Sequence, residues 1–270
     1  MIRVVVLAPI DNSLYARLVC FRLRQESGVQ LAGILVRSPW NLNRIRSEFT
    51  RDGTRLLRKV MDKWVRGDQR FSDQAGDNLM RLAERWELPF KTLKQLAAEY
   101  NIPRLVVSDH NHRRSEEFLN RIAPDLAVFT GGGLIRPNIL SIPSLGILNC
   151  HTGILPQYRG MDVVEWTAAE GRMGDVGFGA TLHLMDKGVD TGPILKNVGL
   201  EPGNWKSFSQ IRAALEVSMV EMMLDGVRGF RDKTITPRPQ NPNDGRQYYV
   251  MHPRVRAAAE LQLLRQLKNG

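Results

Sequence analysis

Three polar side chains in the middle of this chain have the types and spacing that acid–base chemistry needs. Asn149 and His151 stand at alternate positions at the end of an apolar run, and Asp190 follows in a loop bracketed by Gly188 and Gly192. An amide N–H can donate to a developing oxyanion, and an imidazole can carry a proton. A carboxylate can orient a water or keep an imidazole charged. We therefore take Asn149, His151 and Asp190 as candidate catalytic residues.

Other interpretations of these residues stay open. Asp186 is a second carboxylate beside the same loop. A single Asn-x-His pattern is also common where a histidine has only a structural hydrogen bond. No cluster of residues has the spacing of metal ligands, and no Ser or Cys lies in a nucleophile elbow. The sequence therefore predicts no metal.

The apolar run that carries the pair is a predicted strand over 146–151. Residues i and i+2 of a strand project from the same face, so Asn149 and His151 should point together and Cys150 should point into packing. The strand before it, over 125–130, opens directly into Gly131–Gly133. Glycines at the carboxyl end of a strand let the backbone approach a ligand closely. The alternative is a strained turn into a helix over 137–140, but ligands of open α/β sheets gather at this edge, which favours the ligand contact.

The remaining pattern predicts an α/β fold, a Rossmann-like open and mostly parallel sheet with helices on both faces. Strands are expected over 3–9 and 29–37, with a helix over 14–24 between them. Ser115 is the expected N-cap of a helix over 116–122. The first strand-to-helix turn contains neither G-x-G-x-x-G nor a Walker pattern, which disfavours a nucleotide cradle there.

We expect a catalytic domain over residues 1–200, interrupted by an Arg- and Trp-rich helical insertion at about 41–88. That insertion could bind an acidic partner or a membrane surface. The commoner explanation is a set of additional helices packed on the domain. A C-terminal helical and extended appendage should fill 201–270. It reads as a helix over 207–227, a Pro-rich segment and a basic helix from Pro253.

The composition is that of a soluble globular protein, with 270 residues, 43% of them hydrophobic and 24% charged. The net charge of +10 could attract a nucleic acid or a phosphorylated substrate, or could simply be a solvated basic surface. Cys20 and Cys150 lie in apolar runs and should be reduced. There is no run of about 20 apolar residues and no signal-peptide layout, so we expect a cytoplasmic protein without a membrane span.

A set of motifs, taken together, resembles the folate-dependent formyltransferases. This family includes the methionyl-tRNA, glycinamide ribonucleotide and nucleotide-sugar formyltransferases. The resemblance is strongest over about 101–200. The motifs are Asn149-Cys150-His151, Leu155-Pro156, Tyr158-Arg159-Gly160, Trp166, and Met185 with Gly188-Val189-Asp190-Thr191-Gly192 and Ile194.

The resemblance implies an enzyme with 10-formyltetrahydrofolate as formyl donor and no metal. It implies an Asn–His–Asp trio in which Asn149 and protonated His151 stabilise the oxyanion, while Asp190 supports the His charge and an ordered water. Family members often have His-Pro-Ser where this chain has His151-Thr152-Gly153. The folate is expected to contact two loops, through Phe129, Gly131, Gly132, Gly133, Leu134, Ile135, Asp186 and Gly188.

The acceptor is expected to be an amine of a small metabolite, first of all a nucleotide-linked amino sugar. Methionyl-tRNA and glycinamide ribonucleotide are alternatives. Water is a further alternative acceptor, as in a formyltetrahydrofolate hydrolase. A non-catalytic binding protein built on the same fold is the remaining alternative. The sequence leaves the oligomeric state open, a homodimer included. The candidate acceptor-binding residues are Asp11, Asn12, Ser13, Tyr158, Arg159 and Gly160.

Overall fold

The computed structural model describes residues 1–38, 76–201, 205–241 and 243–269, without the side chains of 266–269. The described chain folds as two units. The first contains the residues before 148 other than 76–82, and the second contains 76–82 and everything from 148 onwards. Most of the predicted insertion over 41–88 lies outside the described residues. Its last part includes α4 (Leu79–Arg85).

The first unit is built on four parallel strands. They are β1 (Ile2–Ala8), β2 (Val29–Arg37), β3 (Arg104–Val107) and β4 (Leu126–Phe129). They lie in the order β3-β2-β1-β4, and each neighbouring pair is parallel. The side chains of β1 are almost completely buried, as expected for an apolar central strand covered on both faces.

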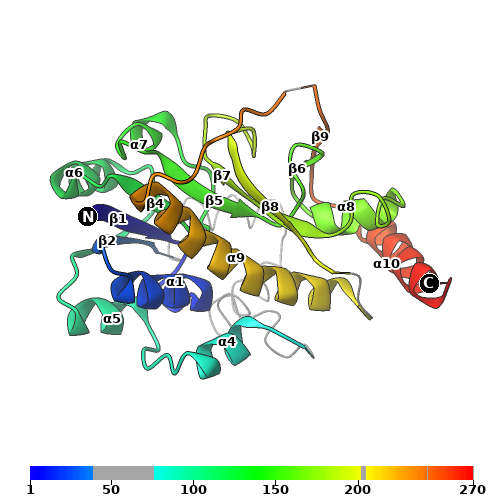
Figure 1. Ribbon diagram of the computed structural model, residues 1–270, viewed down its shortest axis with the longest axis horizontal. Coiled ribbons are helices and arrows are strands. Elements are labelled where there is room, and N and C mark those ends of the chain that lie inside the picture. The colour runs from blue at the N-terminus through cyan, green and yellow to red at the C-terminus, as the bar shows by residue number, and fades with distance from the viewer. Residues whose placement is uncertain (39–75, 202–204, 242, 270) are drawn as a thin grey trace. The chain divides into compact units, whose positions relative to one another are not determined.

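Helices cover both faces of these strands, which confirms the predicted Rossmann-like α/β class. Figure 1 shows α1 (Leu14–Gln25) and α5 (Leu93–Glu99) on one face, with α6 (Arg113–Ile122) and α7 (Pro137–Leu140) on the other. The Ser13 hydroxyl accepts a hydrogen bond from the Ala16 amide and so begins α1.

The predicted N-cap of α6 is wrong. The helix begins at Arg113, and Nδ1 of His112 accepts from the Arg114 amide at 3.2 Å. The Ser115 hydroxyl donates back to the Asp109 carbonyl at 3.3 Å. A histidine acceptor therefore replaces the expected serine, because the preceding loop takes the serine hydroxyl.

The second unit is built on antiparallel strands. They are β5 (Ile147–His151), which starts at the boundary, β7 (Gly179–Leu184) and β8 (Ile194–Gly199). β7 lies between the other two and is antiparallel to both. The long helix α9 (Phe208–Arg231) packs along β7 and β8 (Figure 1).

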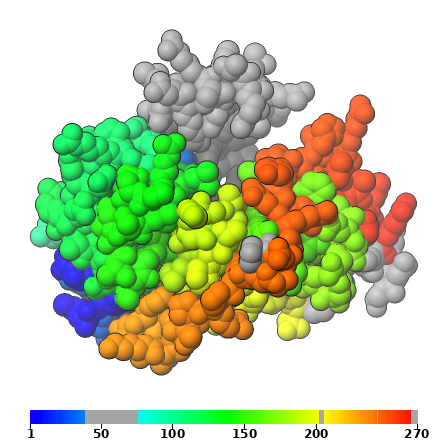
Figure 2. Space-filling view, turned by 90° about the horizontal axis from the view of Figure 1, so that it is seen from above, coloured from blue at the N-terminus to red at the C-terminus, as the bar shows by residue number. Residues whose placement is uncertain are grey.

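A small parallel sheet joins the loop after β5 to the C-terminal segment. It consists of β6 (Tyr158–Gly160) and β9 (Arg246–Tyr248). The rings of Tyr158 and Tyr248 stack with their centroids 5.0 Å apart. Figure 2 shows the orange C-terminal segment on the surface of this unit, beside its yellow-green residues.

A buried carboxylate connects three helices of the second unit. Glu165 of α8 (Val163–Ala169) is 1% exposed and accepts from the Arg212 guanidinium at 2.5 and 3.2 Å. Arg256 of α10 (Pro253–Asn269) lies 3.2 Å from the same carboxylate. Asp162 lies 3.7 Å from Arg212. Glu165 thus holds α9 and α10 against α8 by charge.

Both cysteines are free and buried, as predicted, and burial raises the pKa of each thiol. Within the ranges that the structure describes, no helix combines the length and the apolar character that a membrane span needs.

Candidate active site

Strand β5 delivers the two predicted polar side chains to one face. His151 and Asn149 alternate with Cys150, whose sulfur lies 3.9 Å from the sulfur of the buried Met222 on α9. The predicted alternation is therefore present.

The His151 imidazole has a partner at each nitrogen. Nε2 lies 2.8 Å from the Tyr158 carbonyl oxygen, which can only accept, so Nε2 carries the hydrogen. Nδ1 lies 3.4 Å from Oδ2 of Asp190. Burial lowers the pKa of His151, and the Asp190 charge and the Tyr158 carbonyl only partly oppose this. Burial therefore favours the neutral imidazole, in which the free electron pair is on Nδ1 beside a carboxylate.

Asp190 is held as an anion. It has a positive φ of 53°, and its Oδ2 accepts from the Gly160 amide at 2.9 Å. Burial alone would raise the pKa of Asp190, but the neighbouring imidazoles of His183 and His151 and the Gly160 amide together lower it to about 2. A proton that reaches Nδ1 of His151 would therefore be stabilised by a fixed negative charge.

His183 belongs to this cluster, and sequence reasoning missed it. It lies on β7 directly opposite Asn149. Its Nδ1 donates to the Leu184 carbonyl at 2.9 Å, which leaves Nε2 to accept from the Asn149 amide nitrogen at 3.0 Å. Nε2 also lies 3.5 Å from Asp190. His183 therefore fixes the orientation of the Asn149 amide, whose second N–H has no hydrogen-bond acceptor among the described residues and can donate to a ligand.

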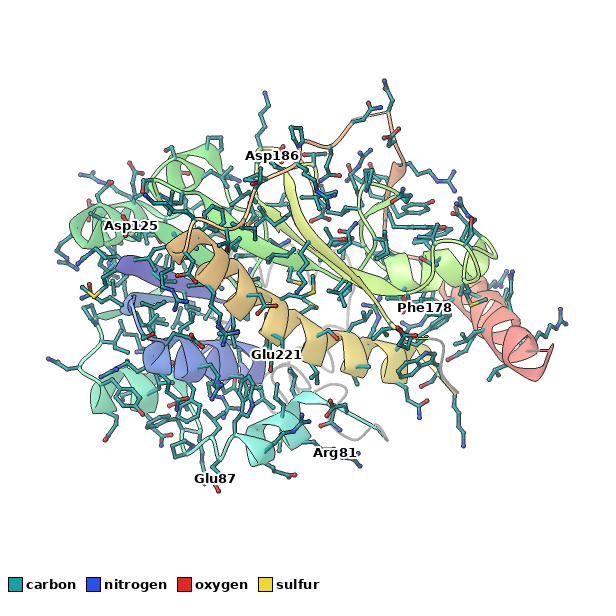
Figure 3. All side chains as sticks on the ribbon, in the orientation of Figure 1. Arg81, Glu87, Asp125, Phe178, Asp186 and Glu221 are labelled. Atoms are coloured by element: carbon teal, nitrogen blue, oxygen red, sulfur yellow. The ribbon has the colours of Figure 1, made fainter. Side chains whose placement is uncertain are left out.

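Of the two candidate carboxylates, only Asp190 contacts the imidazoles. Asp186, labelled in Figure 3 at the end of β7, accepts from the Gly188 amide at 2.9 Å and from the Thr191 hydroxyl at 2.7 Å. These bonds shape the loop. A Cβ added at Gly192 would lie 1.8 Å from the Leu184 carbonyl oxygen, so the close return of the loop requires glycine there.

The Gly131–Gly133 loop of the first unit has an unusual backbone. Its φ angles are +113°, +123° and +101°, which only glycine adopts readily. Arg37 donates to the Gly132 carbonyl, and Asn111 donates to the Leu134 carbonyl at 2.9 Å. The neighbouring candidates Phe129 and Ile135 are buried, whereas the Leu134 side chain is 70% exposed. Contact of this loop with a ligand stays a prediction.

A family comparison adds to this geometry. Residues 69–216, more than half of the chain, match the family model described as formyl transferase.

The chain belongs to the formyl transferase family.

The sequence relatives of this chain include methionyl-tRNA formyltransferases. Methionyl-tRNA formyltransferase from Microcystis aeruginosa is 35% identical over 154 residues, which are 56% of this chain and 46% of that protein. The chain thus spans about half of the length of the curated relatives it matches.

Two solved structures share the fold. Phosphoribosylglycinamide formyltransferase from Anaplasma phagocytophilum has a TM-score of 0.55 at 15% identity, covering 93% of this chain and 99% of that one. The sugar 3N-formyl transferase WlaRD, crystallised in the presence of dTDP and 5-N-formyl-THF, has a TM-score of 0.52 at 13% identity. It covers 92% of this chain and 70% of that one.

The candidate acceptor residues have mainly structural contacts in this formyl transferase. The Asp11 carboxylate lies 2.6 Å from the Arg104 guanidinium, and Ser13 caps α1. The buried Tyr158 donates its hydroxyl to Glu170 at 2.8 Å. Arg159 is half-buried and donates to the Asp244 carbonyl at 3.5 Å, while Gly160 and Tyr158 form β6.

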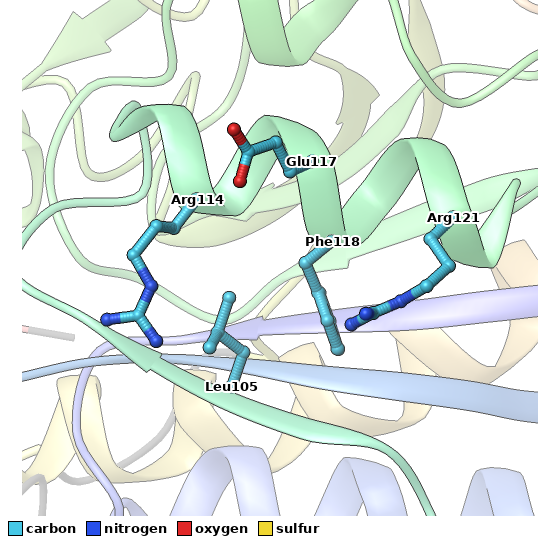
Figure 4. A pocket seen from close by; sticks show the side chains of 5 residues that line it. All are labelled: Leu105, Arg114, Glu117, Phe118 and Arg121. Carbon is cyan, nitrogen blue, oxygen red and sulfur yellow. The ribbon is translucent and has the colours of Figure 1, made fainter.

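A pocket of about 200 Å³ lies elsewhere, in the first unit. Leu105 of β3 and four residues of α6 line it, as Figure 4 shows: Arg114, Glu117, Phe118 and Arg121. None of the predicted site residues lines this pocket. Among the described residues, no group of His, Cys, Asp or Glu side chains is arranged to hold a metal ion.

Replacing His183 by Phe is expected to lower kcat about 10- to 100-fold, with a smaller change in KM, because the Asn149 amide loses the acceptor that orients it. Steady-state kinetics check this. His183→Gln, whose amide oxygen can still accept, should retain more activity. If His183→Phe had the same kcat as the unaltered enzyme, His183 would have no role in orienting Asn149 for the reaction.

The buried His110 should make stability depend on pH. Burial and then the Arg37 charge lower the pKa of His110 from 6.5 to about 4. The unfolded chain takes up this proton first, so the free energy of unfolding should fall by about 3 kcal/mol as the pH drops from 6.5 to 4. Urea unfolding at several pH values measures this. In His110→Gln, this loss of unfolding free energy between pH 6.5 and 4 should disappear. The same pH dependence in the variant and the unaltered protein would contradict the prediction.

Proposed function

We propose that this chain transfers a formyl group from 10-formyltetrahydrofolate to an amine. The observation that carries the proposal is the arrangement around Asn149: His183 orients its amide, and the ionised Asp190 lies beside Nδ1 of His151. Membership in the formyl transferase family supports it. So does the related fold of a sugar formyl transferase crystallised with 5-N-formyl-THF.

Formyl transfer requires stabilisation of an oxyanion and transfer of a proton. The acceptor nitrogen bonds to the formyl carbon, the carbonyl electron pair moves onto oxygen, and the bond to the folate nitrogen then breaks. Asn149 donates its free N–H to the developing oxyanion. His151 takes the proton that the acceptor nitrogen loses, at Nδ1, and returns it to the leaving folate nitrogen, while the negative charge of Asp190 stabilises the imidazolium between these steps. The glycine loop, Asp186 and Gly188 stay predictions as folate contacts.

The proposed acceptor is the amino group of a nucleotide-linked sugar. The turn after β1 supports this choice over a ribonucleotide phosphate, since it lacks a glycine-rich phosphate loop and commits Asp11 to Arg104. The net charge of +10 suits an acceptor that carries phosphates. The nucleotide dTDP in the sugar formyl transferase crystals fits the same choice.

Methionyl-tRNA is the second candidate acceptor. The 35% identity to a methionyl-tRNA formyltransferase favours it, and the basic surplus suits a polyanion. Salt separates the two candidates. Transfer to tRNA should weaken steeply as the salt concentration rises, whereas transfer to a sugar nucleotide should change far less.

The test is incubation with 10-formyltetrahydrofolate and, separately, dTDP- or UDP-linked amino sugars, methionyl-tRNA, glycinamide ribonucleotide or no amine. We expect tetrahydrofolate and a formylated sugar nucleotide to form in equal amounts. Formylated tRNA or ribonucleotide would change the acceptor only. Formate release without an amine would favour a hydrolase, and no reaction and no folate binding would overturn the proposal.

A further inference from the structure

The C-terminal segment returns to the loop that carries Asp190. Both N–H groups of the Gln240 amide point at backbone carbonyls of this loop, since Nε2 lies 3.0 Å from the Asp190 oxygen and 2.6 Å from the Gly192 oxygen. Just before it, Arg238 and Ile194 exchange two backbone hydrogen bonds of 2.8 Å. One side-chain amide thus clamps both sides of a tight loop.

Asp190 needs such a clamp. Its φ of 53° lies in the left-handed region, which a residue with a Cβ occupies only when its surroundings hold it there. The carboxylate position that results brings Oδ2 to the Gly160 amide and to Nδ1 of His151. A restraint on the Asp190 backbone is therefore a restraint on the distance between carboxylate and imidazole.

The same segment also fixes the opposite side of the pair. β9 pairs with β6, whose Tyr158 carbonyl accepts from His151 and whose Gly160 amide donates to Asp190. A Cβ at Gly160 would lie 2.2 Å from the Tyr248 carbonyl oxygen, so the two strands lie in close contact. Hydroxyls of Tyr158 and Tyr248 both donate to Glu170 at 2.8 Å.

We propose that Gln240 is a positioning residue that holds Asp190 at His151, with β9 supporting the same pair through β6. The kinetic part rests on the proposed function and deepens it; the geometric part does not. Gln240 does not touch the reacting atoms. Its effect on rate passes through the carboxylate that stabilises the imidazolium.

The test compares Gln240→Met with Gln247→Met. Methionine has nearly the length of glutamine but no side-chain N–H. Gln247 is the control because it lies on β9 of the same C-terminal segment and its side chain is exposed. In Gln240→Met, kcat should fall about 10- to 100-fold, with KM for the folate changed less than about 2-fold. Gln247→Met should match the unaltered enzyme in both constants.

A second readout needs no turnover. His151 faces Asp190, His183 and the more distant Arg212, so its ring nitrogen resonances report the nearby charges. In Gln240→Met the NMR titration of His151 should move to lower pH, because Asp190 is held less closely, and exchange of the Gly160 amide proton should speed up. If Gln240→Met does not fold, Gln240→Asn keeps the amide but is too short to reach both carbonyls, and should give the same shifts.

The outcomes distinguish the positioning role of Gln240 from the proposed formyl transfer. Unchanged kcat together with an unchanged His151 titration in a folded variant overturns the role of Gln240 while leaving formyl transfer intact. If the unaltered chain transfers no formyl group, the proposed function fails, and the NMR comparison still decides whether Gln240 positions the pair. Equal shifts in Gln240→Met and Gln247→Met would also overturn the inference.

Discussion

Replacing Asp190 by Asn is expected to lower kcat about 1,000-fold or more, the usual scale when a histidine base loses its charged partner. Asn has the same shape and can still accept from the Gly160 amide, so the loop should keep its conformation. What it lacks is the negative charge 3.4 Å from Nδ1 of His151. Burial would then act on His151 with less opposition, so the pKa of His151 should fall further. Single-turnover kinetics across pH measure both effects.

Asp186→Asn is the matched control for this experiment. Among the described residues, the Asp186 carboxylate accepts from Gly188 and Thr191 in the same loop, and an amide oxygen can replace it in both bonds. The kcat of Asp186→Asn at saturating folate should therefore stay close to that of the unaltered enzyme, while the predicted folate contact of Asp186 would appear in KM for the folate. Comparable losses in the two variants would mean that loop shape, rather than the Asp190 charge, limits the reaction.

The largest effect on stability is expected at Glu165. Glu165→Ala leaves the Arg212 guanidinium, 17% exposed, without its bidentate partner and removes the carboxylate beside Arg256. Breaking a buried ion pair on one side costs about 3–5 kcal/mol. Asp162, 3.7 Å from Arg212, should recover only part of this. Urea unfolding measures the loss.

An exposed pair provides the comparison. Asp175 lies 2.5 Å from Arg172, but both side chains are about half exposed, so Asp175→Asn should leave the urea midpoint unchanged. A Glu165→Ala protein as stable as Asp175→Asn would show that the buried pair contributes nothing net. The double variant Glu165→Met/Arg212→Met should recover stability, since no buried charge is then left unpaired.

Local patterns were sufficient for much of this molecule. The apolar run over 29–37 became β2 with the predicted bounds, and alternation along β5 placed Asn149 and His151 on one face. Both inferences depend only on residues that are close in sequence. The family motifs identified the family for the same reason, since they are short and have fixed spacing.

The missed features depend on pairings between distant segments. His183 joins the cluster because β7 is antiparallel to β5 in a register that puts it opposite Asn149, and no local pattern encodes that register. Gln240 reaches Asp190 only because the C-terminal segment turns back. The cap of α6 was missed for a smaller reason: both His112 and Ser115 could accept, and the Asp109 carbonyl decided between them.

The pairing of β6 with β9 has a consequence for the time at which the enzyme becomes competent. A ribosome makes Asn149, His151, His183 and Asp190 well before it makes Tyr248. A nascent chain that has emerged only as far as α9 therefore carries every reacting group but not the strand that steadies two of them. Domains fold progressively during synthesis. We therefore expect the nascent chain to reach its full rate of formyl transfer only after β9 has left the exit tunnel.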